Sequence, residues 1–177
     1  MADVDPARQD AFAPSDELSI RAATASDLLA LMDLWRELSE HQAPWRVFSP
    51  RPAMEEEVRR SYQRAVDDPR SLLLVAEVGG RIVGTAWGHR VVPSSFSDEP
   101  AIELSGAIVA AARRGEGVGR ALATEIGRFA ERQGIRRVVV KTFARNEDAL
   151  EFWHRIGFEP RMIQMVADSE RLSRGAP

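Results

Sequence analysis

The sequence contains no cysteine and only one lysine, Lys141, in 177 residues. Without cysteine the chain forms no disulfide, binds no metal through thiolates and has no thiol nucleophile. It also lacks any run near the ~20 apolar residues that cross a membrane, and it shows no basic and apolar leader. We therefore expect a cytoplasmic protein that works without a metal and has no membrane partner.

Charge is unevenly spread along a chain of ordinary globular composition, 44% hydrophobic and 29% charged. Five acidic residues against Arg8 give residues 1–17 a net charge of −4, which leaves +1 for the rest out of the total of −3. With Pro6, Pro14 and few apolar residues, this stretch is predicted to be a disordered acidic tail. The near-neutral remainder has scattered arginines and no basic footprint for a nucleic acid.

Hydrophobic periodicity predicts one domain over residues 18–167, in which strands and helices alternate. The Gly79-Gly80 link predicts an antiparallel hairpin, because two-residue primed turns need positive φ. Strand–helix–strand connections over residues 101–143 require parallel pairing. We therefore expect an α/β (α+β) fold with a mixed, mostly antiparallel sheet and helices on both faces. The predicted strands are 18–22, 72–78, 81–92, 101–110, 135–143 and 158–166; the predicted helices start near 24–27 and at 53, 118 and 147; residues 168–177 are predicted to be a loose tail.

A glycine- and arginine-rich loop, residues 109–120, joins the fourth predicted strand to the helix that starts at residue 118. Gly115, Gly117 and Gly119 free the backbone to adopt positive φ and to approach a ligand closely. The helix start adds unpaired N–H groups and a positive dipole end, and three arginines add charge. This combination indicates a site for phosphate or pyrophosphate. The loop lacks the lysine of nucleotide triphosphatase loops and fails the dinucleotide fingerprint, and a solvated glycine turn is the plain alternative.

A second pattern follows one helix and one strand later: Asn146-x-x-Ala-x-x-Phe-Trp-x-x-x-Gly-Phe158. With Arg114-x-x-Gly117-x-Gly119, it resembles the two motifs of the GNAT superfamily of N-acetyltransferases, over about residues 18–166. The resemblance implies a GNAT-like fold with a six- to seven-stranded sheet. It also implies acetyl-coenzyme A (acetyl-CoA) as the cosubstrate and direct transfer to a primary amine of a small molecule, a protein or a peptide. Homodimers are common in the superfamily, so a homodimer is left open.

The resemblance implies roles for residues of both motifs. The cofactor-binding residues that it implies are Ile108 and Val109 for the pantetheine arm, Arg114, Gly115, Gly117, Val118, Gly119 and Arg120 for the pyrophosphate, and Asn146 and Trp153 for the arm or its thioester end. Asn146 is equally well explained as a plain helix cap. Gly106 predicts a bulge that splays its strand from the next one, and the amide of Ala107 or Ile108 would then face the thioester carbonyl.

Glu103 is the candidate catalytic base, because an amine must lose its proton before it can attack. It lies eleven residues before Arg114, where several superfamily members carry a glutamate. An ordinary glutamate in the pocket wall is the alternative, and His89 is an alternative base. Asp98 and Glu99 could instead recognise a cationic acceptor.

The acid is the main departure from the family pattern. Trp153 stands where many members have a tyrosine that protonates the departing thiolate, and an indole N–H is no useful acid. His154, Tyr62 or water could help the thiolate leave, or the protein could bind acyl-CoA without catalysis. Residues 41–52, rich in proline and aromatic side chains, are either a lid over the acceptor or a connector packed on the core.

Overall fold

The computed structural model describes residues 17–45, 51, 53–92 and 99–175. Almost all of the predicted acidic tail, and residues 46–50 and 52 of the predicted lid or connector, lie outside the described part. The chain divides into two compact units, residues 1–141 and 142–177.

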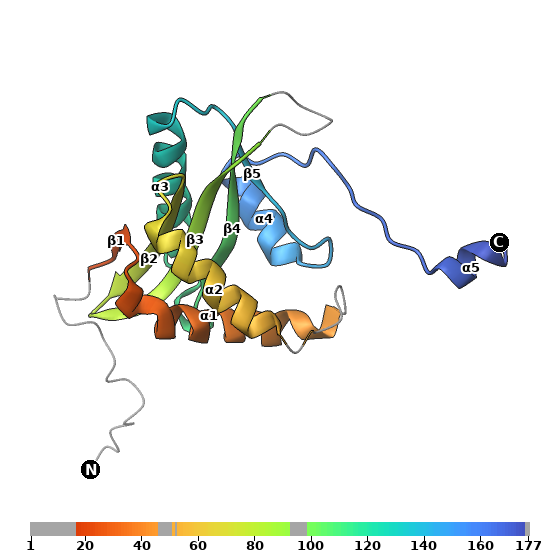
Figure 1. The fold of residues 1–177 in the computed structure, drawn as a ribbon, viewed down its shortest axis with the longest axis horizontal. Helices are drawn as coiled ribbons and strands as arrows, with labels where there is room; N and C mark the ends of the chain where they lie inside the picture. Colours follow the sequence, from red (N-terminus) through yellow and green to blue (C-terminus); the bar gives the residue numbers. More distant parts are fainter. Residues whose placement is uncertain (1–16, 46–50, 52, 93–98, 176–177) are drawn as a thin grey trace, which may run out of the picture. The chain divides into compact units, whose positions relative to one another are not determined.

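The first unit is built on one sheet (Figure 1). Its described strands are β1 (Ser19–Ala22), β2 (Ser71–Val78), β3 (Arg81–Val91), β4 (Ala101–Val109) and β5 (Val138–Val140). Strands β1 to β4 pair antiparallel in chain order, and β5 joins β4 in parallel. The predicted mixed, mostly antiparallel sheet is confirmed. The predicted six to seven strands are wrong for the described residues, which form five.

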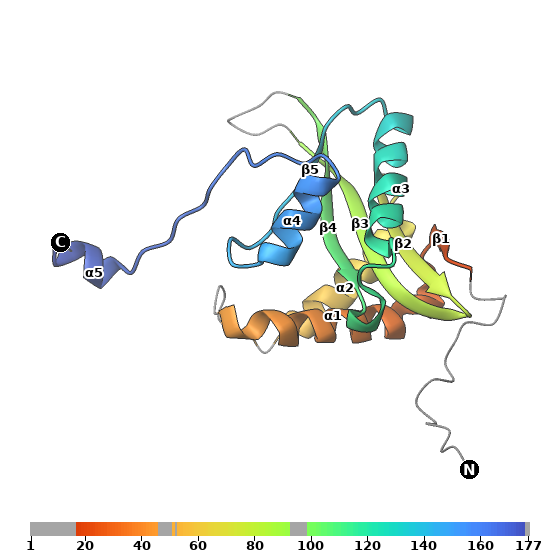
Figure 2. The same cartoon turned by 180° about the vertical axis from the view of Figure 1, so that it is seen from behind.

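Helices cover both faces of this sheet, as predicted (Figures 1 and 2). Helices α1 (Leu28–Gln42) and α2 (Met54–Asp67) lie on one face, and α3 (Val118–Arg132) lies on the other. The α1–α2 face shares one buried cluster with the sheet, in which a fully buried apolar side chain contributes about 1.5–3 kcal/mol. The buried members of this cluster are Ala23, Leu31, Met32, Tyr62, Ala65, Leu73 and Val75.

Helix α3 approaches the sheet closely because β3 presents glycines beneath it. A Cβ atom at Gly88 would lie 2.9 Å from Ile126, and one at Gly84 would lie 3.1 Å from Val118. Ile126 and Ile102 have no exposed surface. Since side chains at the two glycine positions would push α3 outward, these glycines set the position of the helix and hence of the loop before it.

The β2–β3 hairpin has the turn that its sequence predicts. Gly79 and Gly80 have φ of +56° and +74°, which fits the mirror-image turn that two-residue hairpins favour. Helix α3 ends at a glycine in the same region of φ, Gly134 at +66°. There the N–H of Ile135 bonds the carbonyl of Ala130 at 2.9 Å, so a Schellman motif closes the helix.

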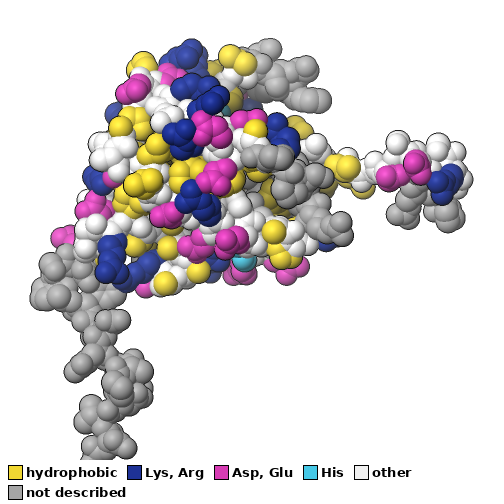
Figure 3. Space-filling model, turned by 60° about the horizontal axis from the view of Figure 1, so that its bottom comes forward, with side chains coloured by type: hydrophobic (Ala, Val, Ile, Leu, Met, Phe, Trp, Pro, Cys, Tyr) yellow, Lys and Arg dark blue, Asp and Glu magenta, His cyan; other side chains and the backbone are white. Residues whose placement is uncertain are grey.

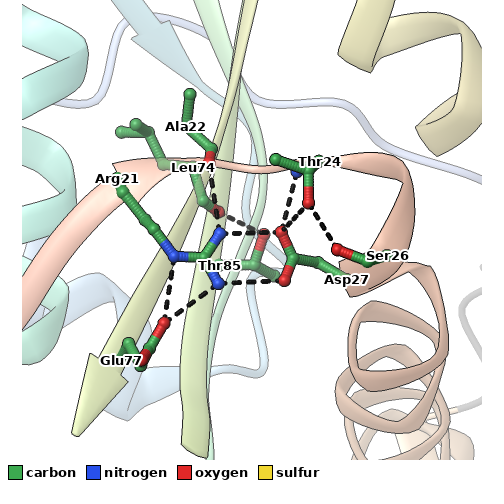
Figure 4. A network of polar contacts seen from close by, with 8 residues as sticks. All are labelled: Arg21, Ala22, Thr24, Ser26, Asp27, Leu74, Glu77 and Thr85. Carbon is green, nitrogen blue, oxygen red and sulfur yellow. Dashed lines mark hydrogen bonds and ion pairs between the residues drawn. The ribbon is translucent and has the colours of Figure 1, made fainter. Parts of the chain in front are cut away.

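A partly buried ion-pair network ties the start of α1 to β1 and β2 (Figure 4). The Arg21 guanidinium donates to both Asp27 oxygens at 2.8 and 2.9 Å, and to Glu77 at 3.0 Å. Asp27 also accepts from the backbone N–H of Thr24 at 2.7 Å and from its hydroxyl at 3.0 Å. The hydrogen bonds from Arg21 hold the pKa of Asp27 far below its usual range, with help from those of Thr24. This network anchors the turn Ala25–Asp27 that leads into α1.

The exposed sides of α1 and α2 carry mixed charges, and one face of the molecule shows both signs interspersed (Figure 3). Arg36 of α1 bonds Glu55 of α2, which links the two helices. Glu56 pairs with Arg59 and Arg60 on α2 itself. Exposed pairs of this kind contribute about 0–1 kcal/mol each, so the apolar cluster beneath them holds the helices in place.

The second unit contains α4 (Glu147–Arg155) and the short α5 (Ser169–Ser173). Gly157, at φ +99°, ends α4, and the N–H of Phe158 bonds the carbonyl of Trp153 at 2.9 Å. Residues 158–168 adopt neither helix nor strand, so the strand predicted at 158–166 is wrong. Its side chains suit a strand, but alternation in sequence does not provide a neighbour to pair with. Among the described residues, no helix has the length and apolar character needed to cross a membrane.

Candidate functional site

The glycine-rich loop between β4 and α3 depends on positive φ at two positions. Gly115 and Gly117 have φ of +83° and +86°. A Cβ at either position would meet no atom within 4 Å, so backbone conformation and not crowding requires glycine there. Gly119 differs, because it lies in the first turn of α3 outside the positive-φ region. The loop therefore presents its backbone without covering side chains at two points.

Helix α3 begins without a side-chain cap. Its N-terminal flanking residue is Gly117, and the N–H of Ala121 bonds the Gly117 carbonyl at 3.0 Å. The N–H groups of Val118, Gly119 and Arg120 precede that first intrahelical bond, so they are free to bind a ligand. Together with the positive end of the helix dipole, they make a site suited to an anion.

The loop arginines are partly engaged with the loop itself. The Nε of Arg114 donates to the Val109 carbonyl at 3.2 Å. Arg113 lies 3.5 Å from the carboxylate of Glu116. These contacts leave the arginines on the exposed surface or half-buried near it, where they can add positive charge to an anion site.

Glu37 of α1 also contacts the loop, a contact that no motif in the sequence indicates. Its carboxylate accepts the backbone N–H of Ala111 at 2.7 Å, across 74 positions of sequence. Glu37 is half-buried in an otherwise charged helix face. This bond fixes the start of the loop to the helix that covers the opposite side of β4.

β4 changes its pairing along its length. It pairs with β5 only over Ile102–Leu104, and it then continues to Val109 beyond the end of β5. Gly106 has φ +57°, and the register with β3 slips there by one extra β4 residue. The predicted bulge is confirmed. The second half of β4, which contains Ile108 and Val109, therefore has an edge that β5 does not cover.

Glu103 lies on the half of β4 that pairs on both sides. Its side chain is 17% exposed, and its two oxygens lie 3.0 and 2.9 Å from the Nζ of Lys141. The Ser105 hydroxyl is 3.5 Å from the first of these oxygens. His89 is its cross-strand neighbour on β3. The structure thus places the candidate base beside a cation, with the alternative base on the next strand.

The environment of His89 is unusual in one respect. Its Nδ1 is buried and has no hydrogen-bond partner among the described residues, and the same holds for the indole nitrogen of Trp87. The two rings pack together with centroids 4.8 Å apart. Buried polar atoms that lack hydrogen-bond partners cost free energy. The two ring nitrogens of His89 and Trp87 therefore lower stability on this part of the α1–α2 face.

Tyr62 of α2 reaches the β4 bulge, which the sequence left as one alternative. Its hydroxyl lies 3.6 Å from the place that a Cβ of Gly106 would take, and the residue is 3% exposed. Burial raises the pKa of Tyr62 to about 12. The phenol therefore stays protonated near neutral pH, and it can donate a hydrogen bond at the bulge.

In the second unit, Asn146 caps α4 as expected. Its Oδ1 accepts the N–H of Ala149 at 3.1 Å. Trp153 is 8% exposed and packs edge-on against Phe152 and Phe158, with centroids 4.8 and 5.2 Å away. The pair with Phe158 is the apolar contact that often accompanies a Schellman motif. Contacts of Asn146 and Trp153 with a cosubstrate remain predictions.

Of the two acidic residues predicted to recognise a cationic acceptor, Asp98 lies outside the described residues. Glu99 pairs with Arg137 at 2.5 Å. His154 is exposed on α4. Within the described ranges, no three His, Cys, Asp or Glu side chains gather in a way that could hold a metal ion.

A mixed sheet whose fourth strand bulges and then opens through a glycine loop into a helix defines the acyltransferase class of fold. The chain belongs to the acetyltransferase (GNAT) family, whose family model matches residues 32–158. N-acetyltransferase 8 of Rattus norvegicus is 32% identical over 103 residues, which make up 58% of this chain and 45% of that protein. The chain spans less than half of the length of the curated relatives that it matches.

Solved structures share the fold. Aminoglycoside N-acetyltransferase AAC(6′)-Iy in complex with CoA superposes with a TM-score of 0.73 at 16% identity, covering 89% of this chain and 99% of that chain. A predicted acetyltransferase of Clostridium acetobutylicum with acetyl-CoA gives 0.69 at 13% identity, covering 89% and 98%. At such low identity these likenesses establish the fold alone.

Proposed function

We propose that this chain transfers the acetyl group of acetyl-CoA to a primary amine of a small molecule or a peptide. The observation that carries the proposal is the loop of Gly115 and Gly117, which opens into the uncapped start of α3 beside the uncovered edge of β4. Two proteins of the same fold have CoA or acetyl-CoA in their solved structures. Family membership adds the same expectation.

The backbone supplies most of the proposed cosubstrate site. N–H groups from Arg114 to Arg120 bind the pyrophosphate, and Ile108 and Val109 pair with the pantetheine arm along the open edge of β4. The Arg114 side chain bonds the Val109 carbonyl, which can accept a second hydrogen bond from the arm. At the bulge, the amide of Ala107 or Ile108 stabilises the oxyanion, a contribution of ~3 kcal/mol for one such donor.

Glu103 acts as the base in this proposal. An alkylamine with a pKa near ~10.4 is mostly protonated at neutral pH, and only the neutral form attacks. Glu103 takes a proton from the ammonium, directly or through water, and the neutral nitrogen then forms the new N–C bond and releases its second proton to solvent. The C–S bond then breaks and CoA leaves as a thiolate.

The thiolate leaves with hydrogen-bond help and without a side-chain acid. Trp153 is packed among phenylalanines and has no acidic proton. The Tyr62 hydroxyl can donate a hydrogen bond near the bulge, and burial raises its pKa to about 12, which disfavours transfer of its proton to a thiolate. Water supplies that proton.

The second candidate function is an acyl-CoA-binding module that does not catalyse transfer. Trp153 favours it, because the position that carries a tyrosine acid in many relatives serves packing here. Thiol release separates the two functions. A protein that binds acetyl-CoA tightly and turns over with no amine would be the binding module.

The cosubstrate site is tested by a matched pair of variants at Gly119, where the backbone is already helical. Gly119→Glu places a carboxylate at the phosphate site, and it should abolish the rise in melting temperature that CoA produces. Gly119→Ala adds only a methyl group and should retain most of that rise. Equal stabilisation of the two variants by CoA would refute the loop assignment. Thiol release from acetyl-CoA with a panel of primary amines then tests catalysis.

A further inference from the structure

Lys141, the only lysine of the chain, lies against the proposed base. It directly follows β5, and its Nζ is 2.9 and 3.0 Å from the two oxygens of Glu103. The lysine side chain is 82% exposed, whereas that of Glu103 is 17% exposed. A primary amine of the protein itself thus occupies the position beside Glu103 where an acceptor amine would be deprotonated.

The strand register puts this amine close to the reacting end of the site. Ile102, Glu103 and Leu104 pair with Val138, Val139 and Val140. One further step places Lys141 level with Ser105, two residues before Ala107 at the bulge. Two strand residues span about 7 Å, which the four-carbon stem of a lysine can cover.

An ordinary surface ion pair would need neither the contact with the proposed base nor the position next to the bulge. It would be worth about 0–1 kcal/mol, and an arginine would serve as well in a chain whose other permanently charged basic residues are all arginine. Here the one nucleophilic side-chain amine stands where β4 and β5 separate. The carboxylate that holds it is the one placed to accept its proton.

We propose that Lys141 is an acetylation site and that the chain acetylates it from bound acetyl-CoA. This inference rests on the proposed function. Glu103 takes a proton from the Lys141 ammonium, the neutral Nζ forms a bond to the thioester carbonyl carbon, and the C–S bond breaks. The second amine proton passes to solvent, and CoA leaves as a thiolate that water protonates. The resulting amide carries no charge, so it no longer forms the ion pair with Glu103.

Mass spectrometry of the full chain tests the inference directly. The protein is incubated with acetyl-CoA and no other amine, and fragment spectra distinguish Lys141 from the N-terminal amine. We expect one acetyl group at Lys141, added faster than to the same chain unfolded in denaturant. The rate should not change when the protein is diluted, because donor and acceptor belong to one chain. A rate equal to that of the unfolded chain, or one that rises with protein concentration, would overturn the inference.

Two variants supply the controls. Glu103→Gln keeps the shape and a hydrogen bond but removes the proton acceptor, and acetylation of Lys141 should slow about 100-fold. Lys141→Arg retains a cation beside Glu103 and should gain no acetyl group at position 141. Unchanged acetylation in Glu103→Gln would contradict the role of the carboxylate.

Lys141→Arg also separates this inference from the proposed function, because the variant contains no lysine. Thiol release by Lys141→Arg with an added amine, together with an unmodified Lys141 in the wild type, would leave the function intact and reject self-acetylation. No thiol release with any amine and no stabilisation by CoA would reject the proposed function first. Acetylation of Lys141 in the wild type would support both.

Discussion

Two carboxylates of the sheet unit, Asp27 and Glu103, each face a basic side chain, and they differ in how completely they are satisfied. Asp27 is 8% exposed and accepts two hydrogen bonds from Arg21 and two from Thr24. Glu103 is 17% exposed, and its close partner is Lys141, which is almost wholly in solvent. The first carboxylate is closed off by its neighbours, and the second keeps a face that another amine could approach.

The contrast indicates what each pair is for. A fully bonded carboxylate held by a planar guanidinium has little freedom, and it fixes β1, β2 and the start of α1 together. A carboxylate held by a single flexible ammonium can exchange that partner at small cost. The carboxylate of Asp27 thus stabilises the fold, and in our proposal the carboxylate of Glu103 takes part in the reaction.

The largest effect is expected on catalysis. Glu103→Gln should lower the rate of acetyl transfer to an amine by about 10²–10⁴-fold, the usual contribution of a general base. The free energy of unfolding should change by less than about 1 kcal/mol, because the pair with Lys141 is open to solvent. Thiol release and urea denaturation measure the two quantities. If Glu103→Gln were destabilised but fully active, Glu103 would be a structural carboxylate like Asp27 and not the base.

Asp27→Ala should instead lower stability. It removes the partner of Arg21 and the acceptor for Thr24, so the free energy of unfolding should fall by about 2–4 kcal/mol. The affinity for CoA of the folded variant should be retained. Asp33→Ala, on the exposed side of α1, is the matched control and should cost less than about 0.5 kcal/mol. Equal losses for the two variants would show that the hydrogen bonds of Asp27 add no stability beyond that of an exposed ion pair.

The same carboxylate should make stability depend on pH in the acid range. Its pKa is lowered in the folded state, so its contribution is complete above the unfolded pKa of about 3.9 and is lost as the pH falls below that value. The variant Asp27→Asn has no charge at this position, so it lacks this pH-dependent contribution at every pH. Urea denaturation at falling pH should therefore show the wild type and Asp27→Asn converging below about pH 4. A constant difference would mean that the charge of Asp27 is unimportant.

The smallest expected effect is that of Lys141→Met on stability. Because the lysine side chain is 82% exposed, losing its pair with Glu103 should change the free energy of unfolding by less than about 0.5 kcal/mol. A loss as large as that of Asp27→Ala would assign the pair a structural role. Chemical denaturation at neutral pH decides the point.

Much of the fold could be predicted because local chemistry determined it. Gly79-Gly80 requires a primed turn, Gly134 and Gly157 end their helices, and Gly106 produces the bulge. At each of these positions the backbone conformation needs glycine, and a glycine can be recognised in the sequence. The extra strand at 158–166 was wrong because a strand is completed by a neighbour, which its own side chains do not specify.

The backbone parts of the site could be predicted from the sequence, whereas its contacts between residues far apart in the sequence could not. The loop of Gly115 and Gly117 follows from composition and spacing. The contacts from Glu37 to Ala111, from Tyr62 to the bulge and from Lys141 to Glu103 join positions between 38 and 74 residues apart. Only the packing of α1, α2 and β5 against β4 brings them together.

β4 is tied on both sides over Ile102–Leu104 and, beyond the bulge, has no β5 neighbour. Such a strand should exchange its amide hydrogens unevenly, slowly in the first half and faster at the outward-facing amides after Gly106. If a pantetheine arm pairs with that edge, the second half should become protected on binding while the first half hardly changes. The exchange rates along β4 would then show which of its amides are protected by the protein itself and which are protected by the ligand.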